Sequence, residues 1–331
     1  MAIKVNYNPA WLSWVASTTT CLRYHGMDVD EVDVAGHSGY AFRMVVARDV
    51  CPSGPTVFDW NELNQGITCL GRSVRTELGM YWGEADSDKA ALDKARRDLL
   101  EFVRYETKEG NPVVIWGTYV PEFGVATGVE DDKYICSTFR EMTGEEQHPL
   151  AHDELHDVGI VYGLSFPHAL HSDQARADAE ALRRAARLLN QPDLQGQYRT
   201  GRGAYDNWIE ALLNYKINAF GNAYNASCWA EQKQFARDFL YRLAERMPAA
   251  RGSLEEAAGL FGECNTHMQQ FAELFAFPAG EAVEQEESRT EGVRLLELAQ
   301  ELEERAALAV AHAAREYEQA SLAAQEEAAA D

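Results

Sequence analysis

The sequence predicts an α+β protein in which a buried helix comes first, strands follow, and helices make up the rest of the chain. Residues 9–25 are rich in Trp, Val, Ala, Thr and Leu and end at Gly26, which is typical of a buried helix that a glycine stops. Short β-branched segments occur up to residue 166, and the pattern is helical from Ser172 onward. Because strands and helices do not alternate regularly, this order favours the α+β class over a parallel βαβ array.

Segments rich in β-branched and aromatic residues predict the strands. Strands are expected in segments bounded by turn residues: 43–49, 72–81, 112–116, 123–128, 133–137 and 159–166. Residues 58–70 and 87–108 predict helices, the second with an apolar stripe. The stretch 31–42 predicts an acidic turn and then a tight glycine turn that opens a short helix or strand. The polar stretch 141–157 predicts a loop or a lid.

The second half predicts helices separated by Pro, Gly and Asn. They are expected at 172–190, 203–219, 222–246, 253–275 and from Glu284 to the end. The expected domains are therefore 1–170, 171–280 and 281–331. The last helix carries an apolar stripe: Leu295, Leu298, Leu302, Ala306, Ala309, Ala313 and Tyr317. This stripe predicts contact with other helices of the chain or with a second copy in a homodimer, and the Ala/Glu-rich end is expected to fray.

The chain is strongly acidic, and its charge excludes some partners. The net charge is −23, and residues 281–331 hold 14 Asp and Glu against 4 Arg. A field of this sign repels nucleic acid and anionic lipid, so neither is expected as a partner. It favours solubility, cationic small molecules or basic peptides.

The N-terminal sequence and the cysteines indicate a cytoplasmic protein without a cofactor. The first 17 residues lack a charged segment followed by a long apolar run, and no stretch reaches the ~18 apolar residues of a membrane span. The cysteines are scattered without a C-x-x-C pair: Cys21, Cys51, Cys69, Cys136, Cys228 and Cys264. This spacing argues against a zinc ribbon or a redox pair and favours buried small apolar side chains.

Several segments, in this order along the chain, resemble one known family. Residues 13–26, with Ser13, Ser17 and Cys21 four apart, are similar to the opening helix of the C39-like peptidases and of the butirosin biosynthesis protein H family. The further matching segments are 36–42 (GHSGYAF), 110–116, 123–131, 203–208, 221–225 and 274–278. The resemblance covers residues 6–280. It implies a papain-like domain with a central antiparallel sheet and an N-terminal core helix, followed by an all-helical extension.

The residues at the family's catalytic positions depart from its pattern. Counting back from Gly26 places Ser13 where the nucleophilic cysteine stands, and counting back from Gly128 places Glu122 where the catalytic histidine stands. The third position falls in residues 136–140 (CSTFR), which contain no Asp or Asn. A papain-like mechanism needs a thiolate, an imidazole and a group that orients the imidazole. The resemblance therefore implies that the ancestral mechanism is lost.

Other residues are alternative candidates if that alignment is displaced. Cys21 lies two turns beyond Ser13 and is either a nucleophile or a core residue. His37 is either a base or, as the stronger expectation, a solvent-exposed turn residue. On a helix, His148, His152 and His156 would share one face and suit a divalent metal, but no fourth ligand is indicated and an acidic lid is the ordinary interpretation, so no metal is expected.

The expected site combines a carboxylate with aromatic rings, which is how proteins hold cationic ligands. The aromatic candidates beside Glu122 and Ser13 are Trp11, Trp14, Tyr40, Trp82 and Trp116, with core packing as the alternative. One hypothesis is a catalytically degenerate papain-like protein that binds a small, amine-bearing ligand or a peptide. The other is an active acyltransferase or amidohydrolase that uses Ser13 or Cys21 with a non-standard base.

Overall fold

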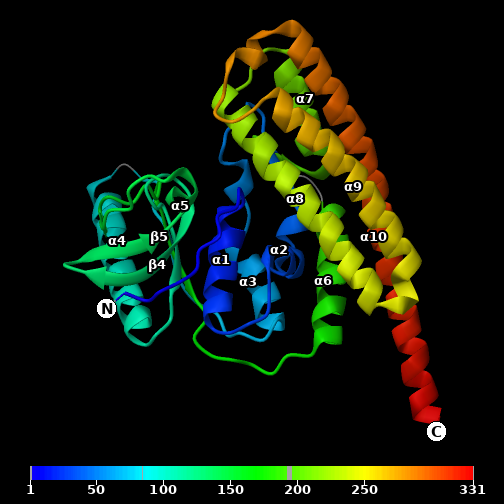
Figure 1. The fold of residues 1–331 in the computed structure, drawn as a ribbon, viewed down its shortest axis with the longest axis horizontal. Helices are drawn as coiled ribbons and strands as arrows, with labels where there is room; N and C mark the ends of the chain where they lie inside the picture. Colours follow the sequence, from blue (N-terminus) through cyan, green and yellow to red (C-terminus); the bar gives the residue numbers. More distant parts are fainter. Residues whose placement is uncertain (1, 84, 192–195, 331) are drawn as a thin grey trace. The chain divides into compact units, whose positions relative to one another are not determined.

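The computed structural model describes residues 2–83, 85–191 and 196–330. In this part the chain is α+β, with an antiparallel sheet of six strands, a second sheet of two strands and a helical C-terminal region (Figure 1). Among the same residues, no helix is long and apolar enough to cross a lipid bilayer.

The structure divides into two compact units. The α+β unit comprises the N-terminal residues up to Val34 together with Gly71–His171, and the helical unit comprises Ala35–Leu70 together with the chain from Ser172 onward. Residues 35–70 therefore join the helical unit, although the sequence places them in a continuous first domain. Their apolar side chains bury against the later helices, as Phe42 does against Phe239 and Phe261 at ring-centroid distances of 6.2 and 6.1 Å.

The six-stranded sheet organises the α+β unit. In spatial order the strands are β2 (Arg75–Met80), β7 (Ile160–Ser165), β3 (Val113–Trp116), β4 (Phe123–Glu130), β5 (Lys133–Ser137) and β6 (Leu150–Ala151). Every neighbouring pair is antiparallel. The expected strands at 72–81, 112–116, 123–128, 133–137 and 159–166 are all present in this sheet.

Helices cover the buried faces of this sheet. Helix α4 (Asp86–Lys108) buries Leu99 and Val103 in a core with Ile115 of β3 and Val161 of β7. Successive strand side chains alternate between faces, so the intervening residues point away from this core. Helix α1 (Ser13–Tyr24) packs against β3 and β4. Its sequence predicted such a helix because it is almost entirely apolar or hydroxyl-bearing, and all of Ser13–Leu22 is buried.

The helical unit consists of long helices and a small sheet. Its elements are α3 (Trp60–Cys69), α6 (Gln174–Leu189), α7 (Gly201–Leu213), α8 (Ala219–Arg246), α9 (Arg251–Leu274), α10 (Glu286–Ala330), β1 (Val45–Ala47) and β8 (Tyr198–Thr200). Strands β1 and β8 pair antiparallel. The expected strand at 43–49 is therefore present, but it lies outside the six-stranded sheet and pairs with a strand that the sequence did not predict.

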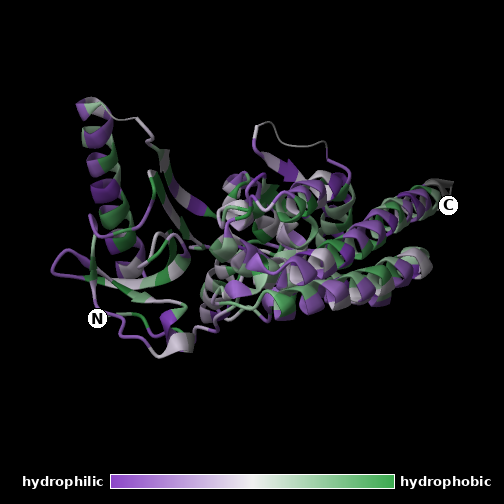
Figure 2. Ribbon diagram, turned by 90° about the horizontal axis from the view of Figure 1, so that it is seen from above, coloured by the Kyte–Doolittle hydropathy of each residue, from purple (hydrophilic) through white to green (hydrophobic). Residues whose placement is uncertain are grey.

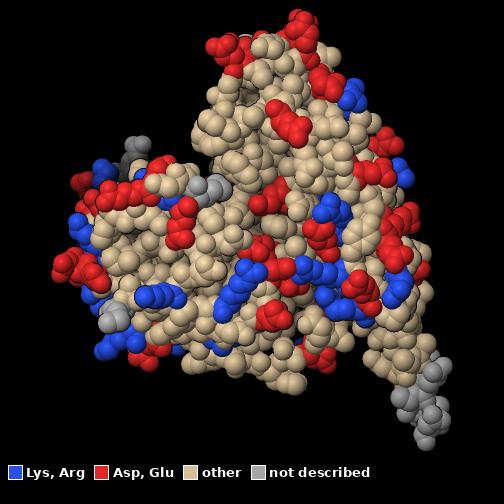
Figure 3. Space-filling view, in the orientation of Figure 1, with Lys and Arg blue, Asp and Glu red and all other residues tan. Residues whose placement is uncertain are grey.

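The apolar stripe of α10 packs within the chain. Helix α10 contacts α9, α7 and α6, and Leu295, Leu302 and Ala306 are buried. Figure 2 shows hydrophobic and hydrophilic residues alternating along this helix, and acidic side chains follow it on the face drawn in Figure 3. The sequence left open whether this stripe contacts the same chain or a second copy. In the structure, helices of the same chain bury Leu295, Leu302 and Ala306 of the stripe.

Two segments differ from their expected structure. Residues 31–42 form helix α2 (Glu31–Ser38) and a 3₁₀ turn at Tyr40–Phe42, so the expected acidic turn is the first turn of a helix. Asp30 explains this start, because its carboxylate accepts a hydrogen bond from the Asp33 N–H at 3.0 Å, and its own N–H donates one to the Asp33 carboxylate at 3.2 Å. The stretch 141–157 holds the end of a short helix, α5 (Arg140–Thr143), and strand β6.

Candidate functional site

Ser13 and Glu122 meet inside the α+β unit. Ser13 is the first residue of α1 and is only 6% exposed. Its hydroxyl donates a hydrogen bond to the Glu122 carboxylate and accepts one from the Phe123 N–H at 3.1 Å. The two residues stand 109 positions apart, so the fold itself creates this pair.

The β3–β4 hairpin loop holds Glu122 in place. The Glu122 carbonyl accepts hydrogen bonds from the N–H groups of Gly117 and Thr118, at 2.9 and 3.1 Å, and from the Thr118 hydroxyl at 3.3 Å. Tyr119 adopts a φ of 66°, a left-handed conformation that is rare for a bulky residue. Its hydroxyl donates to the His148 carbonyl at 2.6 Å. These hydrogen bonds fix the backbone of the loop at Glu122, and the Ser13 hydroxyl holds the carboxylate itself.

Ser13 begins a buried polar row along α1. Ser17 and Cys21 follow it at i+4 and i+8, so the three side chains lie on one side of the helix, and all are buried. The Tyr7 phenol lies close to this row. Burial raises the pKa of Tyr7, the Ser17 hydroxyl acts against that rise, and the nearby Glu122 charge adds to it. The phenol therefore stays protonated at neutral pH. Sequence reasoning missed Tyr7, because only the folded chain brings it to the row.

Among the described residues, no imidazole forms a hydrogen bond with Ser13 or Cys21. Within the described residues, Ser13 has Glu122 and Phe123 as its hydrogen-bonding partners. The Cys21 side chain is fully buried, and burial strongly raises the pKa of its thiol. A thiol in this state supplies almost no thiolate at neutral pH. The residue thus occupies a core position, which was one of its two sequence interpretations.

His37 is buried, so the expectation of a solvent-exposed turn residue is wrong. It lies in the last turn of α2 with 1% of its surface exposed, in the helical unit. Its Nε2 is 3.2 Å from Asp178, whose carboxylate also binds Arg246 at 2.7 Å. Phe239 packs edge-on to the imidazole at a ring-centroid distance of 4.9 Å. The ring is part of a buried hydrogen-bond network between helices.

His148, His152 and His156 do not lie on a helix. Strand β6 and turns occupy this stretch, so the spacing that would align three imidazoles on a helical face does not apply. Across the part of the chain that the structure describes, no group of three or more His, Cys, Asp or Glu side chains is arranged to hold a metal ion.

Most of the aromatic candidates are in the protein core. Trp14, Tyr40 and Trp116 are 1%, 3% and 3% exposed. The Trp116 indole donates to the Asp157 carbonyl at 3.0 Å, and the Tyr40 hydroxyl, in the helical unit, donates to the Pro55 carbonyl. Trp11 is half-buried, and Trp82 is 68% exposed. Trp11, two residues before Ser13, is therefore the partly exposed ring nearest in sequence to the Ser13–Glu122 pair.

The site as a whole joins a partly exposed carboxylate to a buried serine hydroxyl, without a metal cluster or an imidazole among the described groups around Ser13. No protein-family model and no curated protein matches this sequence.

Proposed function

We propose that the α+β unit is a papain-like domain, similar to the C39-like and butirosin H-type domains, that has lost acyl-transfer chemistry and binds an amine-bearing small molecule or a basic peptide at Glu122. The observation that carries the proposal is the hydrogen bond from Ser13 to Glu122. These residues stand at the positions that the resemblance gives to the nucleophile and to its base. A carboxylate replaces an imidazole there, so the site has gained a negative charge.

The chemistry of the pair supports binding over catalysis. The Ser13 oxygen is engaged twice, as donor to Glu122 and as acceptor from the Phe123 N–H. A serine hydroxyl without an imidazole base is a weak nucleophile near neutral pH. A carboxylate has about four acceptor sites and Glu122 is partly exposed, so the hydrogen bond from Ser13 alone does not fill its capacity to accept. Trp11, a partly exposed ring two residues before Ser13 in the sequence, is the candidate for a cation–π contact with the ligand.

The acidity of the whole chain agrees with a cationic ligand. A net charge of −23 attracts amines and raises their association rate. The helical unit would then act as an extension that contributes to solubility.

Neomycin is a small molecule with several amino groups, so it represents the proposed class of ligand. Its binding, measured by isothermal titration calorimetry, tests this function. We expect Glu122→Gln to weaken binding about tenfold, because a charge-assisted hydrogen bond is lost while the shape is kept. Glu109→Gln is the matched control, since Glu109 is an exposed carboxylate of the same unit and its change alters the net charge equally. Equal weakening by the two variants would show that neomycin responds only to overall charge, and the proposed site would be abandoned.

An active serine hydrolase is the second candidate, and the same hydrogen bond favours it. Glu122 would take the Ser13 proton as the oxygen attacks an acyl carbonyl, and would return that proton to the leaving group as the acyl-enzyme forms. A fluorophosphonate probe distinguishes the two functions, because it forms a phosphorus–oxygen bond with an activated serine and releases fluoride. We expect no labelling of the parent protein. Stoichiometric labelling that is absent from Ser13→Ala would favour the hydrolase and contradict the binding function.

A further inference from the structure

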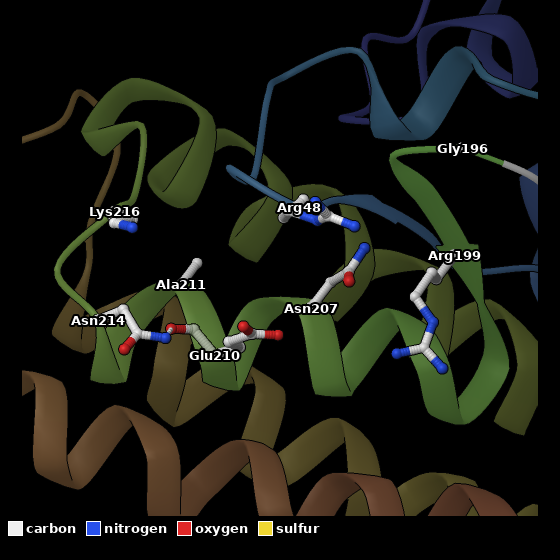
Figure 4. A pocket seen from close by; sticks show the side chains of 8 residues that line it. All are labelled: Arg48, Gly196, Arg199, Asn207, Glu210, Ala211, Asn214 and Lys216. Atoms are coloured by element: carbon white, nitrogen blue, oxygen red, sulfur yellow. Dashed lines mark hydrogen bonds between the residues drawn. The ribbon is translucent and has the colours of Figure 1, made fainter.

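The helical unit contains a cavity with cationic walls, here called the Arg48–Lys216 cavity (Figure 4). Its volume is 670 Å³, which is in the range of small-molecule sites. The polar residues that line it are Arg48, Arg199, Asn207, Glu210, Asn214 and Lys216. All belong to the helical unit, so the cavity is separate from the Ser13–Glu122 pair, which lies in the α+β unit.

Backbone hydrogen bonds hold the walls of this cavity. Arg48 directly follows β1, and its N–H donates to the Gln197 carbonyl at 2.9 Å. Asn207 projects from α7, and its amide group donates to the carbonyls of Val46 and Gln197 at 2.9 and 3.2 Å. The Lys216 N–H donates to the Ala211 carbonyl at 3.0 Å, just after α7 ends. The two cations are thus anchored at their backbones while their side chains are exposed.

The lining of the cavity has a net positive charge, whereas the chain as a whole is negative. Three cations line it, against the single carboxylate of Glu210 among its lining residues. Arg199 lies 3.7 Å from Asp206. Arg48 and Lys216 form no ion pair within the residues that the structure describes. In a chain with a net charge of −23, a cavity whose lining is net positive is the opposite of what composition alone would give.

The hydrogen-bonding groups of the cavity restrict the chemistry of a ligand further. Asn207 is 4% exposed and donates the hydrogens of its amide group to backbone carbonyls, so it offers no donor to an occupant of the cavity. Figure 4 shows the Asn207 side chain directed toward Arg48. A ligand that suits this lining carries anionic oxygens for the cations and a hydroxyl donor for the Glu210 carboxylate.

We propose that the Arg48–Lys216 cavity binds a small polyanion that also carries hydroxyl groups. Phosphate esters and hydroxylated polycarboxylates share this chemistry. Arg48 provides a fork of donors for two oxygens, and Lys216 provides a second positive charge. The Glu210 carboxylate accepts a hydrogen bond from a hydroxyl of the same molecule. This proposal does not depend on the function of Glu122.

Calorimetric titration of the full-length protein with pyrophosphate and, separately, with citrate tests this proposal. We expect binding at low ionic strength that weakens as salt is added, because exposed charges are screened. Arg48→Gln and Lys216→Gln should each weaken binding about tenfold, and the double variant should weaken it further. Arg305→Gln is the control, since Arg305 is an exposed cation on α10 outside the cavity. Circular dichroism checks that each variant keeps its helical content.

The outcomes separate the two ligand classes. Binding of pyrophosphate alone assigns phosphate esters, binding of citrate alone assigns carboxylates, and either result with selective loss in the cavity variants supports the proposal. Absence of binding by both anions overturns it. Equal loss in Arg305→Gln and Arg48→Gln also overturns it, because the response would then come from the overall charge of the chain.

Discussion

The Nζ of Lys233 lies 2.7 Å from a carboxylate oxygen of Glu303, and both side chains are buried in the helical unit. Lys233 also donates to its neighbour Gln232 at 2.9 Å, and the Tyr205 hydroxyl donates to the same Glu303 oxygen at 2.6 Å. These groups join α7, α8 and α10. Burying the Lys233 and Glu303 charges costs free energy, because both groups lose their contact with water. The ion pair and its hydrogen bonds offset this cost only while all of these side chains are present.

Breaking this pair on one side should destabilise the helical unit. We expect Lys233→Met to lower the free energy of unfolding by about 3–5 kcal/mol, because it leaves the Glu303 carboxylate buried without a counter-charge. Adding Glu303→Gln should restore much of the loss, since a neutral amide still accepts the Tyr205 hydrogen bond. Urea denaturation measures both, with the exposed Arg305→Met as control. A single variant as stable as the double variant would contradict this account.

Burial predicts which cysteines react with alkylating agents. Cys51 and Cys69 are partly exposed, whereas Cys21, Cys136, Cys228 and Cys264 are buried. Burial raises the pKa of both Cys136 and Cys264 to about 12, which suppresses their thiolates. Iodoacetamide should therefore modify only the two partly exposed residues in the folded protein, and all six in urea. Peptide mass spectrometry measures this, and rapid native labelling of Cys21 would reopen its role as a nucleophile.

Asp178 makes the helical unit sensitive to acid. Burial alone would raise the pKa of this carboxyl, but hydrogen bonds from His37, Arg246 and Gln174 outweigh it, and the net shift is below the ordinary value of 3.8. The carboxyl thus stays ionised to lower pH in the folded state than in the unfolded state. Its contribution to stability is complete above the unfolded pKa and is lost as the pH falls through the folded pKa.

The acid sensitivity can be measured with one substitution. Urea midpoints between neutral pH and pH ~3 should fall more steeply for the parent protein than for Asp178→Asn, which lacks this titration. The variant should also be less stable at neutral pH, where the parent retains the full contribution. Glu301→Gln, at an exposed position of α10, should keep the steep decline. Parallel pH profiles for the parent and Asp178→Asn would rule out the assigned role.

Local signals explain how much of the α+β unit the sequence could predict. Gly26 follows the end of α1 with a φ of 79°, a conformation that glycine adopts without strain. The sequence therefore predicts where this helix ends. Counting from Gly26 and Gly128 selected Ser13 and Glu122, and the structure does bring these two side chains into contact. The assignment of these two residues to the nucleophile and base positions rests on the resemblance, and it stays a prediction.

The position of residues 35–70 could not be predicted in the same way. His37 looks like an exposed turn residue, but its partners Asp178 and Arg246 come from helices far along the chain. No local pattern encodes such contacts. The Arg48–Lys216 cavity was missed for the same reason, since Arg48 lies 168 positions before Lys216 and neither belongs to a motif.

Gly66 and Gly259 give the last prediction, because each is a helical glycine but their surroundings are opposite. A Cβ at Gly66 of α3 would lie far inside van der Waals contact with the His37 carbonyl oxygen, a backbone atom that cannot rotate away. A Cβ at Gly259 of α9 would meet no atom within 4 Å. The close approach of α3 to the end of α2 therefore requires glycine at residue 66, whereas nothing near residue 259 requires glycine there.

Alanine at these two positions should change stability in opposite directions. We expect Gly66→Ala to lower the free energy of unfolding by about 1–3 kcal/mol through overpacking. Gly259→Ala should raise it by about 0.5–1 kcal/mol, because alanine restricts the unfolded chain and fits the helix without strain. Urea unfolding followed by circular dichroism measures both, and each variant serves as the control for the other's change in helix propensity. Stabilisation by both substitutions would mean that α3 and α2 do not approach as closely as the His37 carbonyl contact requires.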